Sequence, residues 1–219
     1  QVLTFWEPFC YTFTLTNTTN DSNMIKNKAT EKVSDIIFDP KAIKICSIAK
    51  LMPTKGFDRL IKVHSRLISE GLYHHIYIVG SGEQQRELES LISQHKVMNT
   101  FHLIGFKENP YKYLSACDLY VCSSRREGFS TAVTEALILG KPVVSTCCSG
   151  AYELLGEHDE YGIVTENSEE GIYAGLKKML GTPGLIDIYA KEAEKRGTAF
   201  ESSVTVKAVE DLFERLLNE

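Results

Sequence analysis

The chain has 219 residues, of which 43% are hydrophobic and 24% are charged, and its formal net charge is -5. These values are typical of one soluble globular domain with a short extension, and they give no support to a nucleic-acid partner or to a basic membrane-binding patch. The six cysteines form no C-x-x-C pair and have no histidines at zinc-ligand spacing. We therefore expect no metal site and no redox motif, in a reducing, cytoplasmic environment.

The first forty residues are expected to be the remnant of another domain followed by a linker. No run of 18 apolar residues is present, so no membrane-spanning helix is predicted. Residues 1–15 begin with Gln and lack the basic flank of a signal peptide, which suggests a truncated chain. The polar stretch 16–32 is typical of a linker between domains. The sequence thus predicts one complete domain over residues 41–219.

From Ile43 onward, short apolar runs alternate with longer amphipathic ones. This alternation predicts an α/β fold of the Rossmann-like type, a parallel sheet with helices on both faces. His64 shares the apolar face of the first predicted helix, so we expect a packing residue with a satisfied ring nitrogen. The expected strands are 43–49, 75–79, 100–103, 118–122, 142–146 and 162–165, and the expected helices are 57–70, 83–93, 111–116, 131–139, 169–180, 185–198 and 204–217.

Two cations stand five positions apart, at Lys50 and Lys55, in the loop after the first expected strand. Together with backbone N–H groups at a helix start, two ammonium groups can neutralise a diphosphate leaving group. The alternative is a solvated loop with a lysine at the helix entry. Further on, Gly80-Ser81-Gly82 predicts a tight turn and not a dinucleotide-binding loop, because Gln85 occupies the position of the third glycine.

Two carboxylates, Glu127 and Glu135, stand eight positions apart around a Gly-Phe-Ser-Thr turn. Glu127 follows the strand 118–122, and Glu135 lies one turn into a helix that starts near Thr131. Both are expected to flank the crevice at the carboxyl ends of the strands, where open parallel sheets bind ligands. A chance pair of glutamates is the alternative, but the Gly-Phe after the first and the Gly-Lys-Pro-Val at the helix end argue against it.

This pattern resembles the donor-binding signature of the retaining glycosyltransferases of family four, which have the GT-B architecture. The resemblance covers residues 43–217, only the carboxyl-terminal half of such an enzyme. It implies a hexosyltransferase that moves a hexose from a nucleotide-diphosphate sugar, expected to be a UDP-sugar, to a saccharide or lipid-linked acceptor with retention of configuration. It also implies a role in cell-surface polysaccharide or glycolipid synthesis, and a missing amino-terminal acceptor domain that would provide any peripheral membrane association.

The resemblance also implies roles for individual residues. Glu127 would lie near the transferred sugar, and Lys50 and Lys55 would neutralise the diphosphate, which makes these three the expected catalytic residues. Lys50 stands where the family usually has arginine, so the charge is kept but the bidentate fork is lost. Glu135 would accept hydrogen bonds from the ribose. The other expected donor contacts are the N–H groups of Gly128, Phe129, Ser130 and Thr131 and, around the base, Ile104, Phe106, Tyr113 and Leu114.

Several alternatives stay open. Core packing is an equally good explanation for the residues expected around the base. The lysines take over the role of a metal ion, so we expect no metal and no cofactor. The chain could be a non-catalytic nucleotide-sugar-binding fragment without its acceptor domain, since catalysis requires a closed cleft, or part of a nucleotide-sugar epimerase of the same fold. Whether Glu127 acts as a nucleophile or stabilises an ion pair, and which acceptor is used, are also open.

Overall fold

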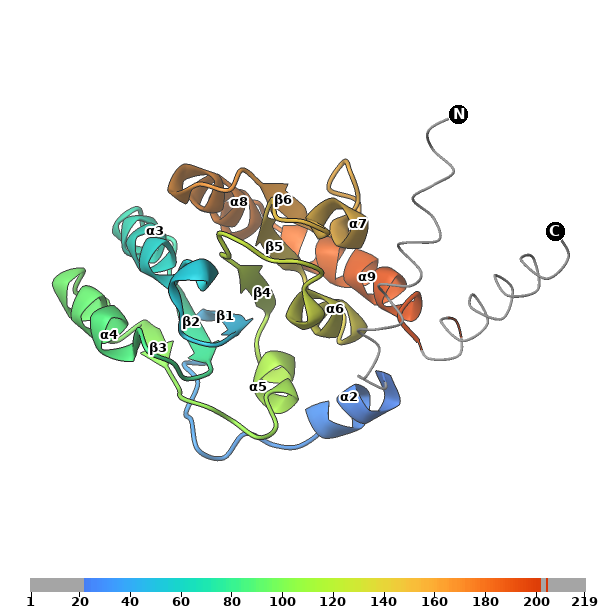
Figure 1. Ribbon diagram of the computed structural model, residues 1–219, viewed down its shortest axis with the longest axis horizontal. Helices are drawn as coiled ribbons and strands as arrows, with labels where there is room; N and C mark the ends of the chain where they lie inside the picture. Colours follow the sequence, from blue (N-terminus) through green and yellow to red (C-terminus); the bar gives the residue numbers. More distant parts are fainter. Residues whose placement is uncertain (1–21, 202–203, 205–219) are drawn as a thin grey trace, which may run out of the picture.

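The computed structural model describes residues 22–201 and residue 204, which form a six-stranded parallel sheet between two layers of helices (Figure 1). The strand order is β3-β2-β1-β4-β5-β6, so the chain builds outward from β1 in one direction and then returns to build outward from β4 in the other. The strands are β1 (Ile43–Ile48), β2 (His74–Val79), β3 (Phe101–Leu103), β4 (Leu119–Cys122), β5 (Val143–Thr146) and β6 (Ile163–Thr165).

Helices cover both faces of the sheet, as the Rossmann-like prediction requires. One core cluster joins the sheet to α3, α4 and α8, and the other joins it to α2, α5, α6 and α7, while α9 contributes to both. The helices are α2 (Ser22–Ala29), α3 (Phe57–Ser69), α4 (Gln85–Gln94), α5 (Tyr111–Ala116), α6 (Thr131–Ile138), α7 (Ala151–Leu155), α8 (Glu169–Gly181) and α9 (Leu185–Thr198), with a short 3₁₀ helix, η2 (Pro53–Lys55), ahead of α3.

The central strands divide their side chains between the two core clusters. In β1, Ile45 packs in the first cluster and the next residue, Cys46, in the second. All six residues of β2 are buried, as expected for a parallel strand that is covered on both sides. None of the helices in the described part of the chain is long and apolar enough to cross a membrane.

The predicted elements agree with the observed ones to within two residues at each end, except that the helix expected over 204–217 lies outside the described residues apart from Val204. The sequence predicts no helix at α2, η2 or α7. The polar helix α2 forms because Ile25 is buried in the second core cluster. Tertiary packing, and not local sequence, stabilises such a short helix.

His64 is a buried packing residue, as predicted. Its Nδ1 lies 2.8 Å from Nε2 of His74, and its Nε2 lies 2.8 Å from the hydroxyl of Thr100. Burial, assisted by neighbouring histidines, lowers the pKa of His64 to about 2, and burial lowers the pKa of His74 to about 4. Both rings therefore stay neutral in the folded protein at ordinary pH.

These two histidines should make the fold sensitive to acid. Below pH 6.5 the unfolded chain binds protons on them that the folded chain does not, so the free energy of unfolding should fall from pH 7 to pH 5 by up to about 1.4 kcal/mol per pH unit for each. Urea unfolding at several pH values measures this slope. His64→Gln should make the slope shallower, whereas substitution of the exposed His158 by Gln should not; equal slopes in the two variants would contradict the assignment.

Candidate functional site

The strand order reverses between β1 and β4, and the three expected catalytic residues lie in the loops that leave the carboxyl ends of these two strands. Lys50 and Lys55 follow β1, and Glu127 follows β4. In open α/β sheets the crevice at such a reversal is the usual ligand site.

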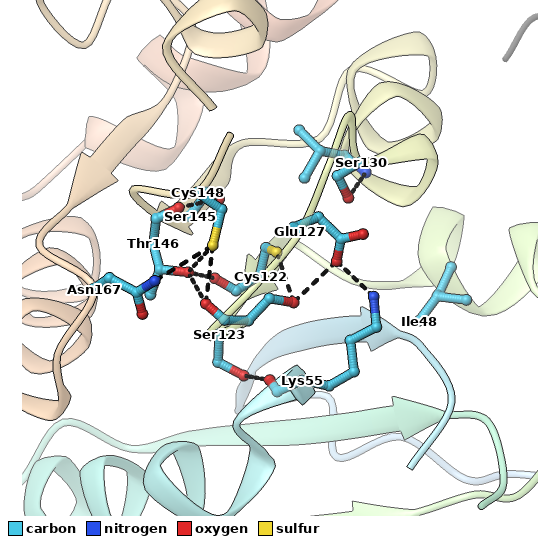
Figure 2. Close-up of polar contacts among 12 residues, drawn as sticks. Ile48, Lys55, Cys122, Ser123, Glu127, Ser130, Ser145, Thr146, Cys148 and Asn167 are labelled. Carbon is cyan, nitrogen blue, oxygen red and sulfur yellow. Dashed lines mark hydrogen bonds and ion pairs between the residues drawn. The ribbon is translucent and has the colours of Figure 1, made fainter. Parts of the chain in front are cut away.

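Lys55 and Glu127 meet in this crevice. The Lys55 Nζ lies 2.5 Å from Glu127 Oε2 (Figure 2). The Ser124 hydroxyl donates to the same oxygen at 3.1 Å. The lysine and glutamate side chains are 22% and 20% exposed, so both are partly shielded from water yet open to a ligand. Partial burial makes this ion pair stronger than a surface pair and keeps two opposite charges ready in one place.

A glycine permits the close approach of the two loops. Gly56 has a φ of +68°, and a Cβ there would collide with the carbonyl oxygen of Ser123. The Ser123 hydroxyl donates to the Lys55 carbonyl at 2.9 Å, and the Arg125 N–H donates to the Thr54 carbonyl at 2.7 Å. The turn before α3 therefore lies directly on the end of β4.

Arg59, on α3, holds the segment that follows β4 through hydrogen bonds to its backbone carbonyls. It is only 6% exposed, and its guanidinium donates to the carbonyls of Ser123, at 2.7 and 3.1 Å, and Ser124, at 2.9 Å. It also donates to Asn167 Oδ1 at 2.6 Å, and the Asn167 amide donates to the Arg125 carbonyl at 2.9 Å. Burial lowers the pKa of Arg59, but a guanidinium remains charged. This network ties the loops after β4 and β6 to α3.

Neither Arg59 nor Asn167 was predicted from the sequence to take part in the site. The available indication for Arg59 is its position among Phe57, Leu60 and Ile61 on the buried face of an amphipathic helix, where an arginine needs acceptors. Asn167 gives no such indication, because a single polar residue after a short strand is common in surface loops.

Lys50, in the loop after β1, lines a pocket of about 400 Å³ together with Phe106 and Lys107. Phe106 is 75% exposed, so its ring is available to a ligand. Gly80 also lines this pocket; its φ is +147°, and a Cβ there would collide with the Ala49 carbonyl. The tight turn predicted at Gly80-Ser81-Gly82 is wrong: these residues are irregular, and the turn lies at residues 83 and 84. The glycine is needed instead because the loops after β1 and β2 pack backbone to backbone, with the Leu51 N–H donating to the Ser81 carbonyl at 3.0 Å.

Glu135 is buried on α6, where the Tyr111 hydroxyl donates to its Oε1 at 3.3 Å. Burial, together with this carboxylate, raises the pKa of Tyr111 to about 12. Ser130 caps α6 by accepting the Val133 N–H at 3.4 Å. Residues 128–130 form the bend before α6, and Thr131 is the first residue of that helix. The N–H groups of residues 128–131 therefore belong to the segment between the two glutamates.

The other residues expected around the base divide into two groups. Tyr113 and Leu114 are buried in the second core cluster and do not line the pocket beside Lys50, as the packing alternative expects. Ile104 packs against the same cluster and borders a different groove, next to Ile37 and Met98. Among the described residues, no group of three or more His, Cys, Asp or Glu is placed to hold a metal ion.

Residues 29–217 match the family described as glycosyl transferases group 1. The chain is 33% identical, over 195 residues, to the N-acetylgalactosamine-N,N'-diacetylbacillosaminyl-diphospho-undecaprenol 4-alpha-N-acetylgalactosaminyltransferase of Campylobacter jejuni, with 88% of this chain and 51% of that protein covered. It is 29% identical to the putative colanic acid biosynthesis glycosyltransferase WcaL of Escherichia coli, with 82% and 48% covered. The chain spans about half the length of these relatives.

Solved structures share the fold. HepE of Anabaena, in complex with UDP and glucose, superposes with a TM-score of 0.68 at 23% identity, covering 78% of this chain and 48% of that one. Sucrose-phosphate synthase from Thermosynechococcus elongatus gives a TM-score of 0.71 at 18% identity, covering 83% and 47%. The Rossmann-like half-fold predicted from the sequence is thus confirmed.

Gly56→Ala should lower the free energy of unfolding by more than the left-handed backbone conformation of this residue alone would cost. Forcing alanine into this conformation costs about 1–2 kcal/mol, and the collision with Ser123 adds to it. Gly71→Ala is the matched control, because Gly71 also has a positive φ, +86°, but open space around it. Urea unfolding of both variants isolates the cost of the close approach; equal losses would show that the two loops can separate freely.

Proposed function

The chain belongs to the family of glycosyl transferases group 1, and on that premise we propose that residues 41–219 are the donor-binding half of a glycosyltransferase that uses a nucleotide-diphosphate sugar. The observation that carries the proposal is the contact of Lys55 with Glu127 at the strand-order reversal. Such a donor has a diphosphate joined to a sugar, so its binding site needs a cation and a sugar-binding carboxylate next to each other.

We assign the positive charge of the lysines to the phosphate end of the bond that breaks, and the negative charge of Glu127 to its sugar end. The bond between the anomeric carbon and the phosphate oxygen breaks, and its electron pair leaves with the nucleoside diphosphate. Lys50 and Lys55 stabilise the negative charge that grows on the phosphate, and Glu127 stabilises the positive charge that grows at the anomeric carbon. The acceptor oxygen bonds to the anomeric carbon, and its proton passes to the departing phosphate. Retention of configuration is part of the proposal through the family resemblance alone.

The nucleoside has two candidate contacts. The exposed ring of Phe106 offers a stacking face beside Lys50, and the carboxylate of Glu135 would accept the ribose hydroxyls. We propose uridine as the base, because HepE was solved with UDP. We propose a hexose as the transferred sugar, and a saccharide or lipid-linked acceptor, because the Campylobacter jejuni relative is named for a diphospho-undecaprenol-linked one.

A second candidate function concerns the isolated chain. It spans about half the length of its relatives, and residues 22–201 contain one sheet. Because sugar transfer requires a cleft that a second domain closes against water, we expect the isolated chain to bind the donor without turning it over.

Calorimetry with UDP tests the proposal. UDP should bind equally well with and without a chelator, because lysines and not a metal ion hold the diphosphate. Lys55→Ala should weaken UDP by about 10- to 100-fold, which corresponds to a charged hydrogen bond of about 1.5–3 kcal/mol, and should leave uridine within about twofold. The control is Lys62→Ala, which removes a more exposed lysine that pairs with Glu169. Binding that disappears with the chelator, or equal losses for UDP and uridine, would refute the lysine clamp.

The two glutamates should differ in their effects. Glu127→Gln should leave UDP affinity unchanged or raise it several-fold, because Lys55 loses its internal counter-charge, but it should remove the extra affinity that a UDP-sugar has over UDP. Glu135→Gln should weaken UDP and UDP-sugar by the same factor, about tenfold or more, since both carry the ribose. Thermal melts of both variants control for misfolding. Identical ligand profiles at unchanged melting temperature would rule out the proposed division of roles.

A further inference from the structure

Asp35 lies in the irregular segment before β1 and binds two residues near the candidate base pocket. The Tyr113 hydroxyl donates to its two carboxylate oxygens at 2.7 and 2.8 Å, and the Lys107 Nζ lies 2.5 Å from Oδ2. We call these three residues the Asp35 clasp. Tyr113 is buried and the Lys107 side chain is 23% exposed, whereas the Asp35 carboxylate is 43% exposed, so a surface carboxylate is held here by one buried and one largely shielded partner.

Two further contacts join the same two segments. The Asn109 side chain donates to the Lys28 carbonyl at 2.9 Å, and the Lys112 Nζ lies 3.8 Å from a Glu31 carboxylate oxygen. Residues 28–35 are thus tied to residues 107–113 at several points. The connection between β3 and α5 is therefore held by a segment that precedes the whole sheet in the chain.

That connection forms a wall of the pocket beside Lys50. Phe106 and Lys107 both line the pocket. At the start of the connection, the Gly80 N–H donates to the Gly105 carbonyl at 2.9 Å, and at its end α5 begins at Tyr111. Between these points the exposed ring of Phe106 is next to Lys107, which the clasp holds in place.

We propose that Asp35 is a positioning residue for the nucleotide base: by holding Lys107 and Tyr113 it fixes the Phe106 wall in the orientation that the base requires. The inference rests on the proposed function, since it takes this pocket as the base site. A wall that is ordered before binding saves the ligand the cost of ordering it. Asp35 itself need not touch the ligand.

The ionisation of the clasp fits this role. The hydrogen bond from Lys107, followed by that from Tyr113, lowers the pKa of Asp35 to about 2. The carboxylate is therefore charged near neutral pH, as the ion pair with Lys107 requires.

The test compares the affinities of UDP and of pyrophosphate by calorimetry. Asp35→Asn should weaken UDP about five- to tenfold and leave pyrophosphate within twofold, and Tyr113→Phe, which removes one donor and keeps the ring, should act in the same direction more weakly. Asp39→Asn is the matched control, because Asp39 accepts the Tyr73 hydroxyl at 2.7 Å in the same segment without contacting the pocket wall. It should leave both affinities unchanged.

A double-variant experiment separates positioning from general stability. In a Phe106→Ala background the wall is already lost, so Asp35→Asn should cost less than twofold in UDP affinity. An undiminished cost in that background, an equal loss of pyrophosphate affinity, or unchanged UDP affinity in both clasp variants would overturn the inference. If the unsubstituted protein bound pyrophosphate and UDP equally well, the base site itself, and with it the proposed nucleotide function, would be refuted instead.

Discussion

The contact between the Gly56 turn and the carboxyl end of β4 is the constraint on which the site depends. Parallel strands place their carboxyl ends at one edge of the sheet, but they do not by themselves bring a lysine after β1 against a glutamate after β4. That requires the backbones to touch, which a residue without a Cβ permits at Gly56. Arg59 then satisfies the carbonyls that this approach buries, so the geometry is stable without a ligand.

The electrostatics of the crevice follow from the same arrangement. The buried charge of Arg59 is compensated by carbonyl oxygens and by Asn167, while Lys55 is compensated by Glu127 at the surface of the crevice. The contacts of Arg59 stabilise the scaffold, and the contact of Lys55 with Glu127 keeps a cation and a carboxylate where a ligand can reach both. Fixed charges of this kind need little rearrangement when a ligand's own charge develops.

The sequence predicted the sheet and most of its helices because buried parallel strands and amphipathic helices leave strong apolar patterns. It also indicated Lys50, Lys55, Glu127 and Glu135, because their residue types and spacing resemble the motif of a known family. It could not indicate Arg59 bound to carbonyls, or Asp35 bound to Tyr113, because these contacts join a side chain to groups that leave no periodic pattern. Tyr113 illustrates the difference: core packing was one of its two predicted explanations and is what the structure shows, but the partner of its hydroxyl was not predictable.

The contacts that build the crevice join distant parts of the chain: Lys55 reaches Glu127 across 72 positions, and Arg59 reaches Asn167 across 108. Closing such long loops costs conformational entropy that only the assembled sheet offsets. During synthesis, β2 and β3 can join β1 before the second side of the crevice exists, because β4, β5 and β6 emerge later. The crevice is therefore among the last features to form, and a ligand bound there recognises the finished domain and adds its binding free energy to the stability of the whole fold.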